Sequence, residues 1–534
     1  MQSLLHHLKH IPLIYGLIAL PSSAFGGNFS QTCSNLTLNG STLYANCKDG
    51  YGNSTTSSLD LNQSITNQFG NFQWQQNGGF AQTARDCSMN SVGILRCAIA
   101  DAQGGWPTRS IDLNAHIDNN HGTLVSDIGR SAANTLPRLV TRDTHIIDAE
   151  RGTTVTLRGV NLGGLFVTEM WMTPMVTSNQ QQTQPKDNYT LIKKLDERFG
   201  ITSEQALLKA YQQTWITEND LQIIKNRGFN AVRVPIWYGQ FYPVDHVSNA
   251  TFRWDAFDDL DRIVNAATSV GLYVILDMHG VVGGQSCSDS TGHMGPDGNE
   301  DGTGHPCSGT NDTNRFWSNA SDQGNTQWMW WQIANHYKGN STIAGYDLIN
   351  EPRGAHDKVQ VWNAYNDLYN TVRSVDRDHI VIMEGAFGGY GQWNWDELPD
   401  PATYHWTNVV YEMHEYQWSR KANDVRNGAT RQVDDFKRHQ SWNVPGYIGE
   451  FNTMTGDPAE WADSVHKYDE AGLSWTMWTY KSSNGTVPNG WGWYDTNGKG
   501  WMPNVNTDCP YWIRKDWEMW TTPNAFTENP NFQF

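Results

Sequence analysis

From about residue 145 to its end, the chain alternates short apolar runs with longer stretches whose apolar residues recur at helical spacing. Eight runs are continuous and rich in Val, Ile, Leu and aromatic residues, which is typical of strands buried on both faces. Amphipathic stretches such as residues 218–226 and 256–269 lie between them and end close to a glycine, a common helix C-cap. The predicted strands are residues 155–160, 230–234, 272–276, 344–349, 380–383, 409–413, 446–448 and 473–478. Strands alternating with helices over about 390 residues predict an α/β fold, a (β/α)8 TIM barrel.

The first part of the chain, residues 28–125, has a different pattern and repeats itself. Residues 58–62, Ser-Leu-Asp-Leu-Asn, return at 110–114 as Ser-Ile-Asp-Leu-Asn, and Thr-Cys-Ser at 32–34 returns as Asp-Cys-Ser at 86–88. Self-similarity at one offset, here about 52 to 54 residues, indicates a duplicated unit. Ser/Thr-rich alternation between turn residues favours short strands. We therefore predict a small all-β domain of two pseudo-symmetric repeats that share one core.

These patterns divide the chain into a signal peptide (residues 1–26), the duplicated all-β domain (27–126), a linker (127–144) and the barrel domain (145–534). The signal peptide is predicted from Lys9, an apolar run at residues 11–20 that is too short to span a bilayer, and small residues at 22–24. No later stretch has the apolar length of a membrane helix. We expect a secreted protein, extracellular or associated with the cell wall, that makes no membrane contact after signal removal.

The composition narrows the range of partners. The chain carries 55 acidic and 37 basic residues, for a net charge of −18, so it has no general attraction for nucleic acid or anionic membranes. With 25 Trp residues, it is also unlike a disordered chain, which is poor in aromatic residues. We expect a folded protein, a monomer, that does not bind nucleic acid.

Two further patterns agree with export. N-x-[ST] glycosylation sequons begin at Asn28, Asn35, Asn39, Asn53, Asn62, Asn188, Asn249, Asn311, Asn319, Asn340 and Asn484. The cysteines fall in close pairs, which suggest disulfides in an oxidising compartment. The candidate pairs are Cys33 with Cys47, Cys87 with Cys97, and Cys287 with Cys307. Cys509 is left over and is interpreted as a buried thiol.

Polar residues follow nearly every predicted strand of the barrel, at the end where barrels carry their active sites. They are Arg233, His279, Asn350, Glu351, Glu384, His414, Tyr416, Glu450 and Trp478. Glu351 and Glu450 end the fourth and seventh strands and would face each other across the barrel mouth. Two facing carboxylates are what glycoside hydrolysis needs, one to attack the anomeric carbon and one to move protons. A buried ion pair with Arg233 is the alternative for either carboxylate alone, and the whole polar set favours catalysis.

The same stretches are similar to glycoside hydrolase family 5 over the whole barrel domain, and most of all to its fungal exo-β-1,3-glucanase-like branch. The matching segments are residues 158–164, 169, 171–174, 232–236, 276–280, 350–352, 414–417 and 448–451. The resemblance implies that Glu351 is the acid/base and Glu450 the nucleophile, and that Glu169 belongs to the substrate-binding set.

The other members of that set have plausible roles. Asn350 can bind the sugar 2-OH, Arg233 can keep Glu450 ionised, and Tyr416 can donate to the nucleophile. His279 and His414 can bind hydroxyls or position the carboxylates, and Trp478 can stack on the sugar. Glu384 is a second-tier candidate, either a substrate contact or a structural carboxylate, and Trp237, Trp393 and Trp395 are weaker stacking candidates. We expect no cofactor and no metal, since no ligand-spaced motif such as H-E-x-x-H is present.

Residues 27–33, 58–62 and 111–117 resemble the cyanovirin-N homology domain, an all-β, domain-swap-like fold whose members include oligosaccharide-binding proteins. The first cysteine pair has that family's spacing. The second pair encloses a shorter loop, so the first repeat is the better candidate for a sugar site. A spacer domain without a ligand is the alternative.

Several departures leave the substrate open. Leu165 stands where the similar glucanases carry Trp, Lys481-Ser482-Ser483 replaces their Lys-Thr-Glu, and the Gly-rich loop at residues 283–325 is long. The prediction is a β-glucan hydrolase acting on β-1,3 linkages by double displacement. Open alternatives are a β-1,6-glucanase, a β-1,6-galactanase, a β-mannanase, a wall-remodelling transglycosylase, or an inactive wall-binding lectin.

Overall fold

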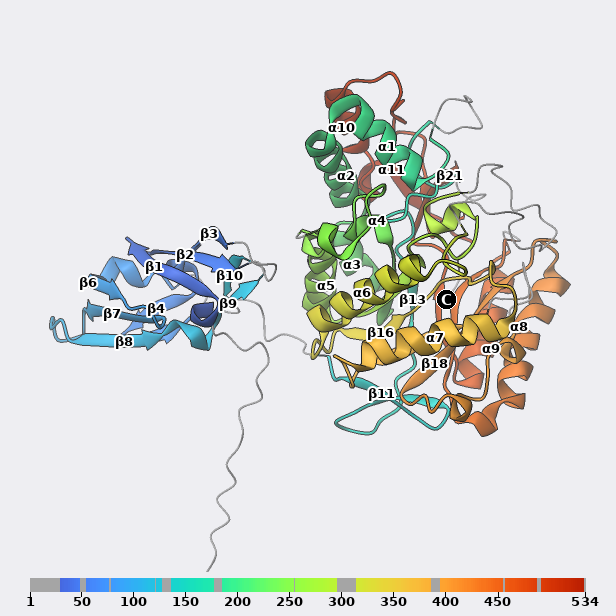
Figure 1. Cartoon of the computed structure of the whole chain (residues 1–534), viewed down its shortest axis with the longest axis horizontal. Helices are drawn as coiled ribbons and strands as arrows, with labels where there is room; N and C mark the ends of the chain where they lie inside the picture. The colour runs from blue at the N-terminus through green and yellow to red at the C-terminus, as the bar shows by residue number, and fades with distance from the viewer. Residues whose placement is uncertain are drawn as a thin grey trace, which may run out of the picture. The chain divides into compact units, whose positions relative to one another are not determined.

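The computed structural model describes residues 29–48, 54–75, 78–120, 122–126, 136–176, 185–253, 255–294, 314–385, 394–454, 457–486 and 491–532. The chain divides between Ala132 and Ala133 into two compact units, which Figure 1 shows as an all-β unit and a larger α/β unit. The predicted signal peptide lies outside the described residues, as do residues 127–135 of the predicted linker.

The first unit contains the predicted duplication, with a three-stranded antiparallel sheet followed by a hairpin in each half. The first half consists of β1 (Cys33–Asn39), β2 (Thr42–Lys48), β3 (Ser54–Asp60), β4 (Ile65–Gln68) and β5 (Asn71–Trp74). The second consists of β6 (Ala84–Met89), β7 (Ile94–Ile99), β8 (Thr108–Asp112), β9 (Ile117–Asn120) and β10 (Thr123–Ser126). The repeated motif has one structure in both halves, because Asp60 and Asp112 each accept a hydrogen bond from the backbone two residues on and cap a short 3-10 turn.

The hairpin of each half is bonded to the sheet of the other half. The side-chain amide of Asn67 donates to Thr83 Oγ1 (3.0 Å) and to the carbonyl oxygen of Ala100 (2.8 Å). Asn119 makes the matching bonds, to Thr32 Oγ1 (2.9 Å) and to the carbonyl oxygen of Lys48 (2.8 Å). Apolar residues from both halves form one core. This confirms the pseudo-symmetric pair with a shared core.

The disulfide predictions are confirmed where both partners are described. Cys33–Cys47 joins β1 to β2, and Cys87–Cys97 joins β6 to β7. Cys287 is also disulfide-bonded, and its predicted partner Cys307 lies outside the described residues. The prediction for Cys509 was wrong, because this free thiol is exposed. It precedes the first turn of a surface helix, where no core surrounds it.

The second unit is a closed barrel of eight parallel strands in sequential order. The strands are β13 (Arg158–Asn161), β14 (Ala231–Trp237), β15 (Tyr273–Gly280), β16 (Ile343–Asp347), β17 (Ile380–Glu384), β18 (Val409–Tyr416), β19 (Gly446–Asn452) and β20 (Ser474–Met477). The crossover helices α3 (Glu218–Asn226), α5 (Asp258–Val270), α6 (Ala320–Tyr337), α7 (Lys358–Arg373), α8 (Ala422–Arg438) and α9 (Pro458–Ala471) surround it. The predicted barrel is therefore confirmed. Because β15, β18 and β19 run further than their apolar cores, His279, His414, Tyr416 and Glu450 lie within strands rather than after them.

A hairpin closes the barrel at the end opposite to the carboxyl ends of its strands. Strands β11 (Leu139–Arg142) and β12 (His145–Asp148) pair with each other. Their apolar side chains Leu139 and Ile146 pack with Ile275, Ile380 and other inward-facing strand residues. The segment expected as a linker therefore contains a strand of the second unit.

Additional elements surround the opposite end of the barrel. Helices α1 (Asn188–Phe199) and α2 (Ile201–Trp215) are inserted between β13 and α3, and α4 (Tyr238–Phe241) follows β14 directly. The chain ends with β21 (Lys481–Thr486), β22 (Tyr494–Thr496), α10 (Pro510–Trp517), α11 (Thr522–Ala525) and β23 (Phe526–Glu528). Within the described ranges, no helix combines the length and apolarity needed to cross a membrane.

One predicted glycosylation site is not accessible in this fold. Asn188 begins α1 and is 3% exposed. Its side-chain amide donates to the carbonyl oxygen of Phe166 at 3.1 Å. Since an acceptor asparagine needs a free amide at the surface, the sequon at Asn188 would remain unmodified in the folded chain.

Candidate functional site

Two buried carboxylates meet at the carboxyl end of the barrel strands. Glu450 lies within β19 and Glu351 lies in the loop after β16, and they are 5% and 9% exposed. Glu351 adopts a positive φ of 43°, a conformation that is strained for a non-glycine residue and is often found at functional sites. Its backbone N–H donates to Glu384 Oε2 at 2.6 Å. Glu384 therefore holds the backbone of Glu351 in place from below.

The two carboxylates are close to each other because both approach the same imidazole. His414 Nδ1 lies 3.1 Å from Glu351 Oε1 and 3.6 Å from Glu450 Oε2. The two oxygens are therefore no further apart than these two distances together. A spacing of roughly 5 to 5.5 Å is typical of retaining glycosidases, and roughly 6.5 to 9.5 Å of inverting ones. The two distances therefore favour the shorter spacing, which is that of retaining glycosidases.

Glu450 is held from two further directions. Arg233 Nη1 donates to Glu450 Oε1 at 2.8 Å, and the Tyr416 hydroxyl donates to Glu450 Oε2 at 2.8 Å. Arg233 also donates to Asn350 Oδ1 at 2.9 Å. One oxygen of the carboxyl group thus faces a cation and the other a phenol, which fixes the orientation of the Glu450 side chain.

Arg233 sits at the centre of a buried acidic layer below the mouth. Its guanidinium, fully buried, lies 3.0 Å from Asp277, 2.8 Å from Asp347 and 3.2 Å from Glu412. Burial raises the pKa of Asp347 and of Glu412 despite the nearby guanidinium. These two acids therefore hold their protons more readily than surface carboxyls do, which limits the charge of the layer.

At the mouth of the barrel, the pKa values of the neighbouring Glu351 and His414 are shifted in opposite directions. Burial raises the pKa of Glu351, but Arg353, whose Nη2 is 2.8 Å from Glu351 Oε2, and His414 outweigh it and lower the pKa to about 2. Burial lowers the pKa of His414, but Glu450, Glu351 and Glu412 raise it to about 10. The free protein therefore holds Glu351 as a carboxylate beside an imidazolium.

A cavity of about 330 Å³ opens above the two carboxylates. Five of the predicted substrate-binding residues line it together with Glu351 and Glu450, namely Glu169, His279, Asn350, Tyr416 and Trp478. The rings of Trp478 and His279 stack, with centroids 5.4 Å apart and planes 5° apart. Trp478 thus presents a flat apolar surface next to the carboxylates.

The structure places the other predicted binding residues elsewhere. Arg233 and His414 are fully buried and contact the carboxylates rather than the cavity. Glu384 is also fully buried and does not reach the cavity. Of the weaker stacking candidates, Trp237 and Trp395 are core residues away from this cavity, and Trp393 lies outside the described residues.

An aromatic rim on one side of the cavity was not predicted from the sequence. Trp171, Trp418 and Trp491 line it. Trp491 lies 5.2 Å from Trp171 and 5.7 Å from Trp418, measured between ring centroids. Trp418 is half exposed, at 51%. Trp171 belongs to a matched segment and Trp418 directly follows one, so a Trp in or next to a strand-end motif was the available signal.

Asp289, which lies near the predicted Glu169 on the cavity wall, was not predicted from the sequence. Burial and the nearby Asp289 raise the pKa of Glu169 well above its usual value, and burial raises the pKa of Asp289 to about 6. The Trp171 indole donates to Glu169 Oε2 at 2.8 Å, while Glu169 Oε1 is buried without a hydrogen-bond partner. Such an unpaired oxygen can accept a bond from a bound hydroxyl. Asp289 lies in the cysteine-containing loop after β15. A loop has no regular hydrophobic pattern, so the direction of its side chains could not be predicted from the sequence.

Metal binding was also considered at this site. Donor atoms of Glu351, Glu384 and His414 lie within 4.8 Å of one another. These atoms are already engaged, since Glu351 Oε2 accepts from Arg353 and its Oε1 lies 3.1 Å from His414 Nδ1. A protonated imidazole is also a poor ligand. The cluster is better explained as part of the carboxylate site, and the absence of a metal stays a prediction.

Comparisons with known proteins agree with both units. The model of the family described as cellulase, glycosyl hydrolase family 5, matches residues 196–484, and the model of the CVNH domain matches residues 29–125. A β-xylosidase of Phanerodontia chrysosporium is 24% identical over 404 residues, 69% of this chain and 73% of the relative. A glucan 1,3-β-glucosidase of Candida oleophila is 29% identical over 327 residues, 58% of this chain and 70% of the relative. Among solved structures, a rutinosidase from Aspergillus niger aligns with a TM-score of 0.48 and 16% identity over 68% of this chain and 98% of the rutinosidase.

Proposed function

Because the chain belongs to glycosyl hydrolase family 5, we propose that it is a retaining β-glycosidase that hydrolyses a β-glucan, with β-1,3 linkages as the main substrate. The observation that carries this proposal is the close approach of Glu351 and Glu450 to one imidazole at the floor of a cavity. The name of the Candida oleophila relative supports the linkage.

The geometry supports a double displacement. Glu351, a carboxylate in the free protein, first takes up a proton from solvent as substrate binds. Glu450 then attacks the anomeric carbon, the bond to the leaving oxygen breaks, and Glu351 gives its proton to this oxygen. A glycosyl ester on Glu450 results. Glu351, now a carboxylate, removes a proton from water, and the water oxygen displaces Glu450 from the anomeric carbon. Glu450 is released from the sugar, and Glu351 again holds a proton, which returns to solvent when the site empties.

The surrounding residues suit this path. Trp478 would support the apolar face of the reacting sugar, and Asn350 would bind its 2-OH. Tyr416 and Arg233 hold Glu450 in line for attack through the bonds described above. His414 contacts both carboxylates, so its charge stabilises whichever one is ionised at each step.

The ion pair between Arg353 and Glu351 predicts a measurable pH effect. The acid step needs a proton on Glu351, and Arg353 lowers the pKa of that carboxyl. Arg353→Ala removes the cation, so the pKa of Glu351 rises and the proton is kept to higher pH. We expect the alkaline limb of the kcat/KM profile to move upward by about one pH unit. Arg353→Lys, which keeps the charge, should move it much less. An alkaline limb that is identical in wild type and Arg353→Ala would contradict this role.

Activity on a panel of polysaccharides tests the function as a whole. Laminarin, pustulan, galactan, mannan and xylan separate β-1,3-glucan from the other linkages and sugars, including the xylose suggested by one relative's name. We expect laminarin to be degraded at least about tenfold faster than the others, a difference of roughly 1.4 kcal/mol in transition-state binding. Product masses at high laminarin concentration distinguish hydrolysis from transfer. Faster turnover of any other polymer would overturn the assigned linkage, and no turnover of any of them would overturn the function.

We propose further that the first unit binds saccharide and holds the enzyme on insoluble polymer. Support comes from the CVNH match and from a separate core stapled by two disulfides. Disulfides persist in oxidising compartments, which also supports secretion with removal of residues 1–26.

Deletion of residues 28–125 tests this role. Tethering raises the effective concentration of an enzyme at a polymer surface and does not change its chemistry. Activity of the truncated chain on a soluble oligosaccharide should stay within about twofold of wild type. Retention on insoluble glucan should fall about tenfold or more, as measured by pull-down. Unchanged retention would show that this unit does not bind the polymer.

A further inference from the structure

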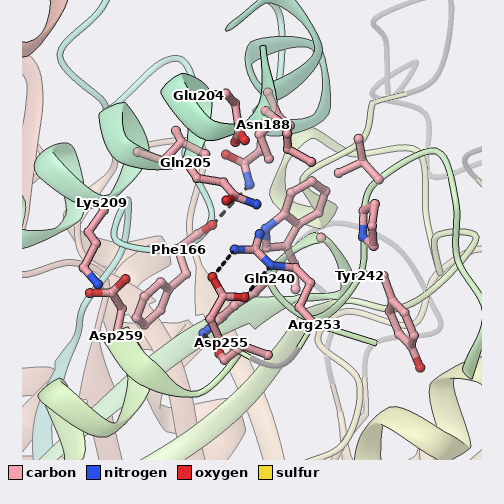
Figure 2. A pocket seen from close by; sticks show the side chains of 18 of the residues that line it. Phe166, Asn188, Glu204, Gln205, Lys209, Gln240, Tyr242, Arg253, Asp255 and Asp259 are labelled. Atoms are coloured by element: carbon pink, nitrogen blue, oxygen red, sulfur yellow. Dashed lines mark hydrogen bonds and ion pairs between the residues drawn. The ribbon is translucent and has the colours of Figure 1, made fainter. Parts of the chain in front are cut away.

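A second, larger cavity lies in the barrel unit and shares no lining residue with the catalytic cavity. It has a volume of about 640 Å³ and is bounded by α1, α2, α4, the first turn of α5 and the segment after β13. Figure 2 shows its side chains, with Glu204, Gln205 and Asn188 on one side and Arg253, Asp255 and Gln240 on the other. Its volume lies in the range of small-molecule sites, roughly 300 to 1,000 Å³.

A buried carboxyl group faces this cavity without a bonding partner. Glu204, on α2, is 3% exposed and lies on the cavity wall, and its carboxyl group makes no hydrogen bond or ion pair with another side chain of the described residues. Burial raises its pKa to about 7. Leaving a buried polar group unpaired costs on the order of 1 to 3 kcal/mol. A group kept in this state on a cavity wall is one that a ligand can satisfy.

A second unpaired acceptor lies on the opposite wall. Gln240, on α4, donates through Nε2 to the carbonyl oxygen of Ala256, at 3.3 Å, while its Oε1 is buried with no partner. Glu204 and Gln240, both on the lining of the cavity, therefore each carry an oxygen without a hydrogen-bond partner among the described residues. Gln205, half-buried on the same wall as Glu204, adds an amide with a donor and an acceptor.

The charges around the cavity disfavour an anion, because its lining carries the carboxyl groups of Asp196, Glu204, Asp245, Asp255, Asp258 and Asp259 against the cations of Lys209 and Arg253. Arg253 is neutralised by Asp255 through two hydrogen bonds, at 3.1 and 3.0 Å. This bidentate pair leaves little attraction for an anion. Asp245, at the rim, is paired with Lys193 at 3.0 Å. Among the described residues of this cavity, no three carboxylate or imidazole groups come close enough together to hold a metal ion.

The walls combine these polar atoms with aromatic rings. Phe252, which is 8% exposed, and the fully buried Tyr242 line the cavity near Arg253, and Figure 2 shows Tyr242 across from the amide groups. A sugar ring matches such a site, since it has hydroxyls that donate and accept at its edge and an apolar face for an aromatic ring. We propose that this cavity is a second binding site for a neutral saccharide unit, separate from the catalytic one.

Counting binding sites in the full chain tests the proposal. The parent chain for this experiment carries Glu351→Ala, so that it turns over sugars slowly. The parent and three variants, each with one added substitution, are titrated with glucose, mannose, xylose and laminaribiose by calorimetry. Glu204→Leu removes the unpaired carboxyl, and Ala206→Trp blocks the cavity from an exposed position of α2 without removing a buried group. Gln213→Leu, on the exposed face of the same helix, is the control.

We expect at least one of these sugars to bind at one site fewer, or more than tenfold more weakly at one site, in both Glu204→Leu and Ala206→Trp. The Gln213→Leu control should match its parent. Equal site numbers and affinities in all four proteins for every sugar would overturn the proposal. The proposal would also be overturned if Glu204→Leu lost a sugar-binding site while the correctly folded Ala206→Trp chain bound sugar as its parent does.

This inference stands on the lining of the cavity and not on the reaction proposed above. Turnover of an aryl β-glucoside by chains that keep Glu351 and Glu450 reports on the reaction alone. Glu204→Leu and Ala206→Trp should leave that turnover within about twofold of wild type. A chain inactive on all substrates that still loses one sugar site in these variants would overturn the proposed activity and keep the second site.

Discussion

Replacing Glu450 by alanine is expected to lower kcat by about 10⁵-fold on any substrate, because loss of a covalent nucleophile removes the route through the glycosyl ester. The fold should persist. Arg233 keeps its contacts with Asp277, Asp347 and Glu412, so no buried cation is left unpaired. Steady-state turnover of laminarin and thermal unfolding together check both statements.

Azide separates loss of the nucleophile from general damage. In Glu450→Ala, azide can occupy the space of the missing carboxylate and attack the anomeric carbon from that side, which gives a glycosyl azide of inverted configuration. Glu450→Gln is the matched control, because it keeps the side-chain volume near Arg233 and Tyr416 and leaves no room for azide. Turnover of Glu450→Ala near the wild-type rate without azide would remove Glu450 from the mechanism.

Replacing Glu351 by alanine should give an effect that depends on the leaving group. A glucan leaving group needs a proton, so kcat/KM on laminarin should fall by about 10³-fold, within the usual range of general acid catalysis. An activated aryl glycoside leaves without help, so its first step should be nearly unchanged. Water then lacks its base and the glycosyl ester should accumulate, which is visible as a burst of phenol in stopped-flow measurements.

The control for this prediction is Glu384→Gln. Glu384 lies below Glu351 and accepts a hydrogen bond from its backbone, so its replacement should slow both substrates by a similar factor and give no burst. Azide should speed the second step in Glu351→Ala and give a product of retained configuration, opposite to the outcome for Glu450→Ala. Equal losses on laminarin and on the aryl glycoside in Glu351→Ala would show that Glu351 is not the acid.

The barrel could be predicted because strands buried on both faces are nearly continuous apolar runs. The same rule misplaced the strand ends. Asp277 interrupts the apolar pattern inside β15 and His414 does so inside β18, so the predicted strands stopped too early, at residues 276 and 413. Helices α1 and α2 carried a usable signal in buried residues at helical spacing, such as Leu191 and Leu195 in α1 and Leu207, Tyr211 and Trp215 in α2. The alternation of strands and helices gave no reason to expect two extra helices there.

The sequence predicted which residues form the site, but not how far each side chain lies below the cavity. Sequence order placed Arg233 and His414 beside Asn350 and Tyr416 at strand ends. In the structure the first two lie behind the carboxylates and the last two lie on the cavity wall. The depth of a side chain depends on strand stagger and on neighbouring side chains, which motif spacing does not encode. Asp347 escaped notice for a related reason, since a buried acid is interpretable only once its partner Arg233 is located.

The exchange of hairpins in the first unit has a consequence for protease resistance. Asn67 and Asn119 each fasten the hairpin of one half to the sheet of the other half, so neither half encloses a core without its partner. Opening one half exposes the apolar residues of both. Limited digestion should therefore leave this unit whole or remove it entirely, with no stable fragment that corresponds to a single repeat.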